Sequence, residues 1–84
     1  MNYPKIQRVP EVLEFLQLSR SNLYKKIQLG LWPKPINLGA RAIGFLSTES
    51  EQVLSAMIAG KSQEEIKELV KTLVESRNQE QGVK

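Results

Sequence analysis

Residues 18–30, LSRSNLYKKIQLG, have the pattern of a short helix with a marked beginning and a marked end. Ser19 is a favourable N-cap, because its hydroxyl can accept a hydrogen bond from a free backbone N–H of the first turn. Gly30 is a favourable stop, because glycine readily adopts the left-handed conformation just beyond a helix. Leu23 and Ile27 lie one turn apart and form a narrow apolar stripe. The stretch therefore predicts a helix with one side packed into a core.

The opposite side of this helix, which we place at about 19–29, is polar and basic. Lysine can bind guanine acceptors or phosphate, asparagine and glutamine can pair with adenine, and serine can pair with several base edges. A solvated helix surface is the plainer alternative, and Tyr24 could equally pack against a neighbouring element or bind phosphate. The mixture favours a helix that reads the major groove of DNA. Its candidate contact residues are Arg20, Ser21, Asn22, Tyr24, Lys25, Lys26 and Gln28.

The whole chain has 84 residues and a formal net charge of +3, which indicates one small basic domain. The charge is unevenly distributed along it. Residues 1–46 carry seven basic and two acidic side chains, for a net +5, whereas residues 47–84 carry five basic and seven acidic ones, for a net −2. A basic first half fits a surface that binds a polyanion, although small domains also acquire such asymmetry by chance.

The composition excludes several classes of chemistry. The chain has no cysteine and no histidine, which removes disulfides, thiol nucleophiles, imidazole bases and the usual zinc ligand sets. The acidic cluster of Glu64, Glu65 and Glu68 is what the first turns of a capped surface helix normally carry. We therefore expect no enzyme, no cofactor and no metal site. Because the chain also lacks a long apolar run and an apolar leader, we expect a soluble cytoplasmic protein with no membrane partner.

The residues on either side of 18–30 predict the elements that would support this helix. Before it, Pro10 suits the first turn of a helix over residues 10–16, and the short link to Ser19 fits a helix-turn-helix. The prolines of WPKP at residues 32–35 then rule out a helix interior. Beyond them, residues 36–38 and 42–46 alternate as strands do.

These two strands predict a small hairpin, or wing, with its tip at Gly39, Ala40 and Arg41. An isolated hairpin is marginal in water, so the wing must pack on the helices. Arg41 at the tip would be free to contact DNA, and a plain exposed turn is the alternative.

The last part of the chain predicts two more helices. Thr48 and Glu51 have the spacing of a capping box, with Ser47 as a competing cap, and Ser62 and Glu65 have the same spacing. We accordingly divide the chain into a loose arm at 1–8, a single domain at 9–78 and a flexible tail at 79–84.

The final helix, at about 62–77, carries a clean amphipathic stripe. This stripe could cover the protein's own core, or it could pair with a second copy and form a homodimer. A small domain has little apolar surface to spare, which favours the first alternative. The stripe consists of Ile66, Leu69, Val70, Leu73 and Val74.

From residue 9 to about residue 53, the chain resembles the AlpA family of phage and prophage regulators, which is related to excisionases and to the DNA-binding part of MerR-type proteins. The resemblance rests on LSRSNLY at 18–24 and on WPKPINLGARAIGF at 32–45. The family tends to have a Leu-Ser-Arg-Ser-Thr-Leu-Tyr type segment, a Phe-Pro-Lys-Pro segment and a Leu-Gly-x-Arg-x-x-Gly-Trp type wing. Phe45 stands where the family usually has Trp, and the helix at 62–77 extends beyond the usual ending.

The resemblance implies a mostly α fold with a small β-hairpin, that is, a winged helix-turn-helix with added C-terminal helices. It also implies a sequence-specific transcriptional regulator of a prophage or integrated element, bound to double-stranded DNA. The helix at 19–29 would enter the major groove, and the wing at 38–43 would lie on the backbone or in the minor groove. An architectural excisionase that bends attachment-site DNA is one alternative. A protein-interaction module that uses the helix at 62–77 is another, of a different class.

Overall fold

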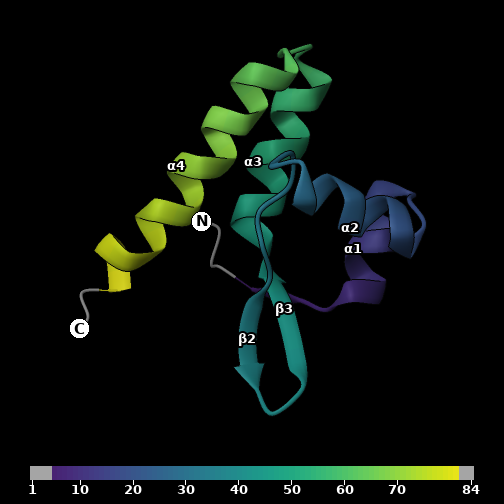
Figure 1. The fold of residues 1–84 in the computed structure, drawn as a ribbon, viewed down its shortest axis with the longest axis vertical. Helices are drawn as coiled ribbons and strands as arrows, with labels where there is room; N and C mark the ends of the chain where they lie inside the picture. The colour runs from purple at the N-terminus through teal and green to yellow at the C-terminus, as the bar shows by residue number, and fades with distance from the viewer. Residues whose placement is uncertain (1–4, 82–84) are drawn as a thin grey trace.

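The computed structural model describes residues 5–81, which form helices around a small antiparallel sheet (Figure 1). A mostly helical fold with a β-hairpin is thereby confirmed. In chain order the elements are β1 (Ile6–Gln7), α1 (Val9–Leu16), α2 (Arg20–Gln28), β2 (Ile36–Gly39), β3 (Ala42–Leu46), α3 (Ser47–Ile58) and α4 (Gln63–Gln81).

The turn between α1 and α2 is tight because the backbone reverses at Gln17. Gln17 has a left-handed φ of 58°, and its side-chain amide donates to the Glu14 carbonyl at 2.7 Å. The Leu18 N–H then donates to the Leu13 carbonyl at 3.0 Å. These bonds satisfy carbonyls that the end of a helix leaves free, and they let α2 begin almost at once.

The sheet has the strand order β1-β3-β2, so that β3 is its central strand. Residues 6 and 7, which we expected in a loose arm, form β1 and pair with β3 in the register Ile6↔Leu46 and Gln7↔Phe45. The Ser47 N–H extends this edge by donating to the Lys5 carbonyl at 2.8 Å. A strand of two residues is too short to show an alternating pattern, and its partner is some forty residues away in the sequence. Residues 1–4 of the expected arm lie outside the described residues.

One side of β3 faces the core. On its other side, a glycine allows side chains of the two neighbouring strands to pack directly on the backbone of β3. Phe45 is buried in the core, whereas Gly44 lies under two apolar side chains from the neighbouring strands. A Cβ at Gly44 would be 2.6 Å from Cγ2 of Ile6 and 3.0 Å from Cδ1 of Leu38. Glycine is therefore needed here for the close approach of the strands.

A single core joins the helices and the sheet. Each of α1, α2, β3 and α3 contributes one apolar side chain that is almost fully inaccessible, and Trp32 from the linker after α2 adds a fifth. The helix α4 covers it with two further buried residues. The members are Val9, Val12, Leu23, Leu31, Trp32, Phe45, Val53, Ile66 and Val70.

The predicted capping box at the start of α3 is wrong. The helix begins at Ser47, directly after β3, with Leu46 in the capping position and no side-chain cap. The Ser47 hydroxyl instead accepts a hydrogen bond from the Lys5 N–H at 3.0 Å. Because the chain passes from strand to helix without a loop, the sheet decides where the first turn lies. Glu51, the expected partner of Thr48, is exposed.

The capping box at the start of α4 is confirmed. The Ser62 N–H donates to Oε1 of Glu65 at 2.9 Å, and the Glu65 N–H donates to Oγ of Ser62 at 3.2 Å. The apolar stripe of α4 packs on the protein's own core, with Ile66 and Val70 buried. The helix continues to Gln81 instead of ending near residue 77, since no glycine or proline interrupts residues 75–81. Residues 82–84 of the expected tail lie outside the described residues.

An ion pair that the sequence did not predict fixes α4 to the rest of the fold. The guanidinium of Arg77 binds the Glu49 carboxylate through two hydrogen bonds, Nη2 to Oε1 at 2.6 Å and Nε to Oε2 at 2.8 Å. The same Nη2 donates to the Lys34 carbonyl at 2.9 Å. The side chains of Arg77 and Glu49 are only 14% and 6% exposed. One guanidinium thus joins α4 to α3 and to the linker between α2 and β2.

Replacing Arg77 by Ala should destabilise the fold. The variant leaves the Glu49 carboxylate buried without its partner, and we expect the free energy of unfolding in urea to fall by about 3 kcal/mol. The double variant Arg77→Met with Glu49→Leu is the control, because an apolar pair removes the unpaired charge and should recover most of the loss. An Arg77→Ala protein as stable as the wild type would contradict this role of the pair.

The capping box of α4 also predicts a dependence on pH. The hydrogen bond from the Ser62 N–H, and then the charge of Lys61, hold the pKa of the Glu65 carboxyl below its usual value. A carboxyl whose pKa is lowered by folding stabilises the fold above its unfolded pKa, and this contribution is lost as the pH falls through the folded pKa. We expect an NMR titration to place Glu65 below an ordinary glutamate, and Lys61→Gln to bring it part of the way back. A Glu65 that titrates at the ordinary value would contradict the prediction.

Candidate nucleic-acid interface

The helix α2 begins and ends where its local sequence predicts. Oγ of Ser19 accepts a hydrogen bond from the Asn22 N–H at 3.3 Å, as an N-cap should. At the other end Gly30 has a φ of +78°, and the Leu31 N–H donates to the Lys26 carbonyl at 2.9 Å. This is the geometry of a helix closed by a left-handed glycine.

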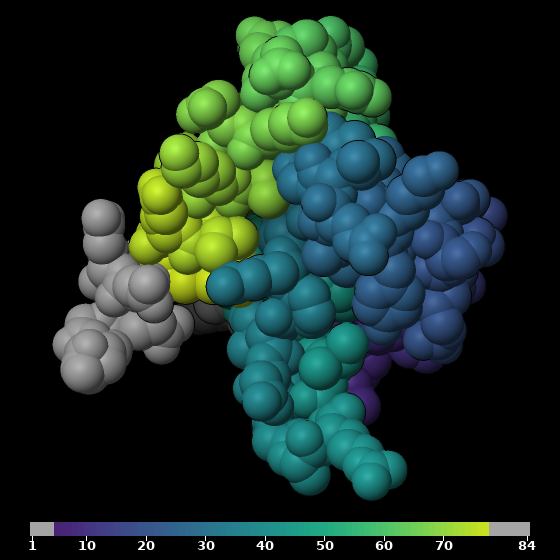
Figure 2. Space-filling model, viewed as in Figure 1, coloured from purple at the N-terminus to yellow at the C-terminus, as the bar shows by residue number. Residues whose placement is uncertain are grey.

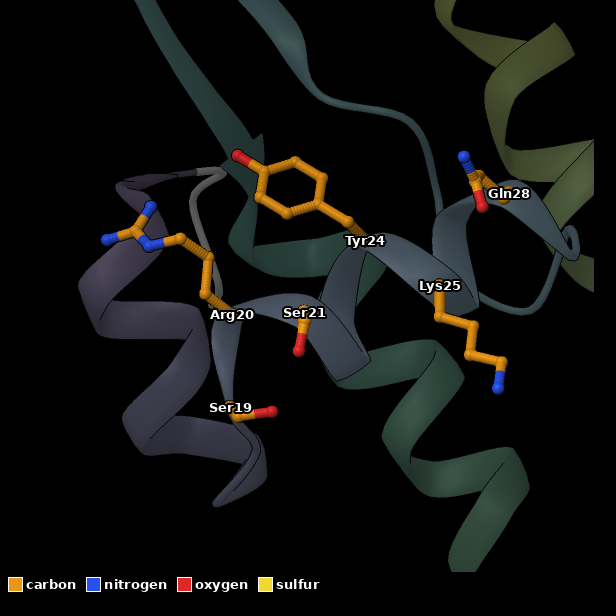
Figure 3. A pocket seen from close by; sticks show the side chains of 6 residues that line it. All are labelled: Ser19, Arg20, Ser21, Tyr24, Lys25 and Gln28. Atoms are coloured by element: carbon orange, nitrogen blue, oxygen red, sulfur yellow. The ribbon is translucent and has the colours of Figure 1, made fainter.

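Packing decides which side of α2 faces outward. Leu23 is fully buried and Ile27 is partly buried, so this side is fixed in the core. Figure 3 shows the outward side chains in two rows, with Arg20, Tyr24 and Gln28 in one and Ser21 and Lys25 in the other. Residues four apart on a helix form such rows. An open hollow of about 800 Å³ is lined by Ser19, Arg20, Ser21, Tyr24, Lys25 and Gln28.

Two of the predicted contact residues lie apart from this group. Asn22 is exposed and contributes its backbone N–H to the cap of Ser19. Lys26 is partly buried, because it follows Leu23 by three residues and so lies at the edge of the buried stripe. It lines a smaller hollow, of about 240 Å³, beside the turn between α3 and α4.

The outward side of α2 keeps its positive charge. The first turn contains no acidic residue, and Lys25 and Lys26 lie in the last turn, where a cation is favourable to the helix dipole. Among the side chains that the structure describes, the one ion pair joins Arg77 to Glu49. Arg20, Lys25 and Arg41 therefore have no carboxylate partner in the described part of the chain.

The wing has its tip where the sequence predicts it. Gly39 and Ala40 have positive φ values of 120° and 35°, and Oδ1 of Asn37 accepts the Gly39 N–H at 2.9 Å. Arg41 follows in the turn and is exposed. Figure 1 shows β2 and β3 projecting beyond the helices, so the tip stands clear of the core. The wing thus presents the exposed cation of Arg41 at its tip, beside the small residues Gly39 and Ala40.

Two arginines that sequence reasoning missed hold the wing in position. Nε of Arg8 donates to the Ile43 carbonyl of β3 at 3.1 Å, and Arg77 holds the Lys34 carbonyl just before β2. These contacts join residues that are 35 and 43 positions apart in the sequence. No local pattern could have revealed them, since each depends on the completed fold.

The sequence model of the family described as "Prophage CP4-57 regulatory protein (AlpA)" matches residues 5–57. The chain belongs to the AlpA family. The matched region of this AlpA-family protein runs from β1 almost to the end of α3, so it contains both α2 and the wing. The helix α4 lies beyond the match.

A relative supports the same relationship. The chain is 37% identical over 54 residues to "Uncharacterized protein ORF88" of Enterobacteria phage P4. The alignment covers 64% of this chain and 61% of that protein, so the chain spans less than two thirds of its relative. No solved structure matches this AlpA-family chain.

Among the described residues, none of the helices is long and apolar enough to cross a bilayer. The described side chains, of residues 5–77, also include no cluster of acidic residues with the arrangement of a metal site.

The cap of α2 can be tested by a single substitution. Ser19→Ala removes the acceptor for the Asn22 N–H, and we expect the free energy of unfolding to fall by about 1 kcal/mol. Ser21→Ala is the matched control, because Ser21 is exposed and should change stability by less than about 0.5 kcal/mol. Urea unfolding of the two variants makes the comparison, and equal losses would argue against the cap.

Proposed function

We propose that this chain is a DNA-binding transcriptional regulator of a prophage or integrated element, acting in the cytoplasm. The observation that carries the proposal is the outward side of α2, where basic and amide side chains stand together without acidic partners beside a projecting wing. Membership of a family described as a prophage regulatory protein supports it.

The mechanism follows from the dimensions of a helix and of DNA. An α-helix with its side chains is about 10–12 Å wide, and the major groove of B-DNA is about 12 Å wide. With α2 in the groove, Gln28 and Asn22 would pair with adenine, while Lys25 and Arg20 would bind guanine or phosphate. Tyr24 is 38% exposed, which leaves its ring half packed and its hydroxyl available to a phosphate.

The wing would supply the second contact. Arg41 would reach a phosphate or the minor groove, and the small residues Gly39 and Ala40 would let the backbone come close to the DNA. Contacts of this kind fix the position of a protein on the duplex, whereas base contacts specify the sequence. One such module makes few base contacts, so useful specificity requires two copies or a bent site.

An architectural excisionase would use the same two surfaces and bend attachment-site DNA. A bending assay on attachment-site DNA, compared with a promoter-reporter assay, separates this alternative from a transcriptional regulator. The DNA regulator is favoured over an interaction module based on residues 62–77 because α4 packs its apolar stripe on its own core. Light scattering at several concentrations tests the homodimer that such a module would form.

DNA binding should depend steeply on salt and on the exposed cations of α2. We expect Arg20→Ala and Lys25→Ala each to weaken binding to duplex sites selected from random DNA. Each should also lower the slope of log affinity against log salt by about 0.9 for every phosphate that the variant no longer neutralises. Gel retardation or fluorescence anisotropy at several salt concentrations measures both effects.

Gln52→Glu is the control for net charge. It also removes one positive unit from the total, but Gln52 lies on α3 beside Ser55 and Leu69, away from α2. Affinity unaffected by raising salt from low to physiological levels would overturn the proposed function.

A further inference from the structure

A second group of basic side chains lies beside the C-terminal end of α2. Lys26 of α2 and Lys61 of the turn between α3 and α4 line one hollow of about 240 Å³. Apolar side chains from Leu31, Met57 and Ile66 line it as well, and Gln63 completes it. The two lysines thus belong to segments far apart in the sequence that meet at the same hollow.

Lys67 of α4 joins this group through Gly30. Cγ of Lys67 is 3.9 Å from the position that a Cβ on Gly30 would occupy, so its aliphatic stem lies against the end of α2. The Lys67 residue is exposed overall, as Lys61 is. A long basic side chain that packs its stem on the protein keeps its charged end in water. Lys67 therefore holds its charge next to the recognition helix.

The charges on α4 are sorted into rows. Gln63, Lys67 and Lys71 follow one another at intervals of four residues, on the flank that Lys67 shows to be next to α2. Glu64 and Glu68 form the next row, one step further around the helix. Glu64 and Glu68 therefore do not separate Lys67 from α2.

Glu65 is the acidic residue whose pKa the charge of Lys61 helps to lower. The Glu65 carboxylate, however, already accepts a hydrogen bond from the Ser62 N–H in the capping box. No ion pair joins Lys26, Lys61 or Lys67 to a carboxylate among the side chains described. Their charges remain available to an external anion.

In Figure 2, α2 lies between the start of α4 and the wing. The three follow one another along one face of the molecule. The described part of the chain is about 35 Å in its longest direction. A duplex with its major groove on α2 has sugar-phosphate backbone on both sides of that groove, one side toward the wing and the other toward α4.

We propose that Lys26, Lys61 and Lys67 form a second phosphate-binding surface, which holds the DNA backbone on the side of α2 opposite to the wing. This inference rests on the proposed function and extends it to α4. Lys61 and Lys67 lie beyond the residues 5–57 that match the family. The C-terminal helix thereby lengthens the contact with DNA, in addition to covering the core.

The test compares Lys61→Gln and Lys67→Gln with Gln52→Glu, since all three change the net charge by the same unit. The probe is a duplex selected from random DNA by the wild-type protein. We expect each lysine variant to lower the slope of log affinity against log salt by about 0.9 and Gln52→Glu to leave it unchanged. Hydroxyl-radical footprinting should show that the lysine variants leave one edge of the site unprotected, while the edge held by Arg41 stays protected. Thermal unfolding confirms that these exposed substitutions leave the fold intact.

The outcomes separate this inference from the proposed function. A wild-type protein that does not bind DNA overturns both. A wild-type protein that binds DNA, with lysine variants that keep the full salt slope and the full footprint, overturns only the second surface. In that case the lysines serve another acidic partner or none, and α2 and the wing remain the DNA-contacting elements.

Discussion

The position of the wing relative to α2 depends on the guanidinium of Arg77. This group binds the Glu49 carboxylate and the Lys34 carbonyl together, so α4, α3 and the linker after α2 meet at one point. The linker is also anchored by Trp32 and Pro33, both almost fully buried. The buried indole of Trp32 and the hydrogen bond from Arg77 to the Lys34 carbonyl together leave this linker little conformational freedom. The helix α2 and the wing are therefore held at a set spacing.

This rigidity would favour binding to a partner, because the groups that become ordered on binding lose conformational entropy. Flexible loops and side chains lose conformational entropy on association, and a preorganised surface reduces that loss. In this chain the backbone of α2 is fixed by the Ser19 cap and by Leu23 in the core, and the wing is fixed by Arg8 and Arg77. The parts left free are the exposed ends of long side chains. Such an arrangement suits the proposed insertion of α2 into a groove of fixed width.

The elements that the sequence predicted correctly are those whose signals are local. The limits of α2 follow from Ser19 and Gly30, and the start of α4 follows from Ser62 and Glu65, because each cap involves residues only a few positions apart. The strand β1, the first turn of α3 and the Arg77 contacts were missed for the opposite reason. Each of them depends on a partner brought near by the complete fold, and neither capping nor periodicity reports such a partner.

In the candidate site, too, some features follow from the local sequence and others only from the complete fold. The sequence has a basic first half and a mildly acidic second half, and all the DNA-contacting residues that we predicted lie in the first. In space the halves are not separate, because α4 folds back beside α2 and Lys67 packs on Gly30. Glu64 and Glu68 occupy a row further around α4, so the average charge of the second half conceals the basic flank of Lys67 and Lys71. The net charge of a stretch of sequence therefore does not predict a binding surface by itself. The fold must first show which charged residues lie on the same side of the molecule.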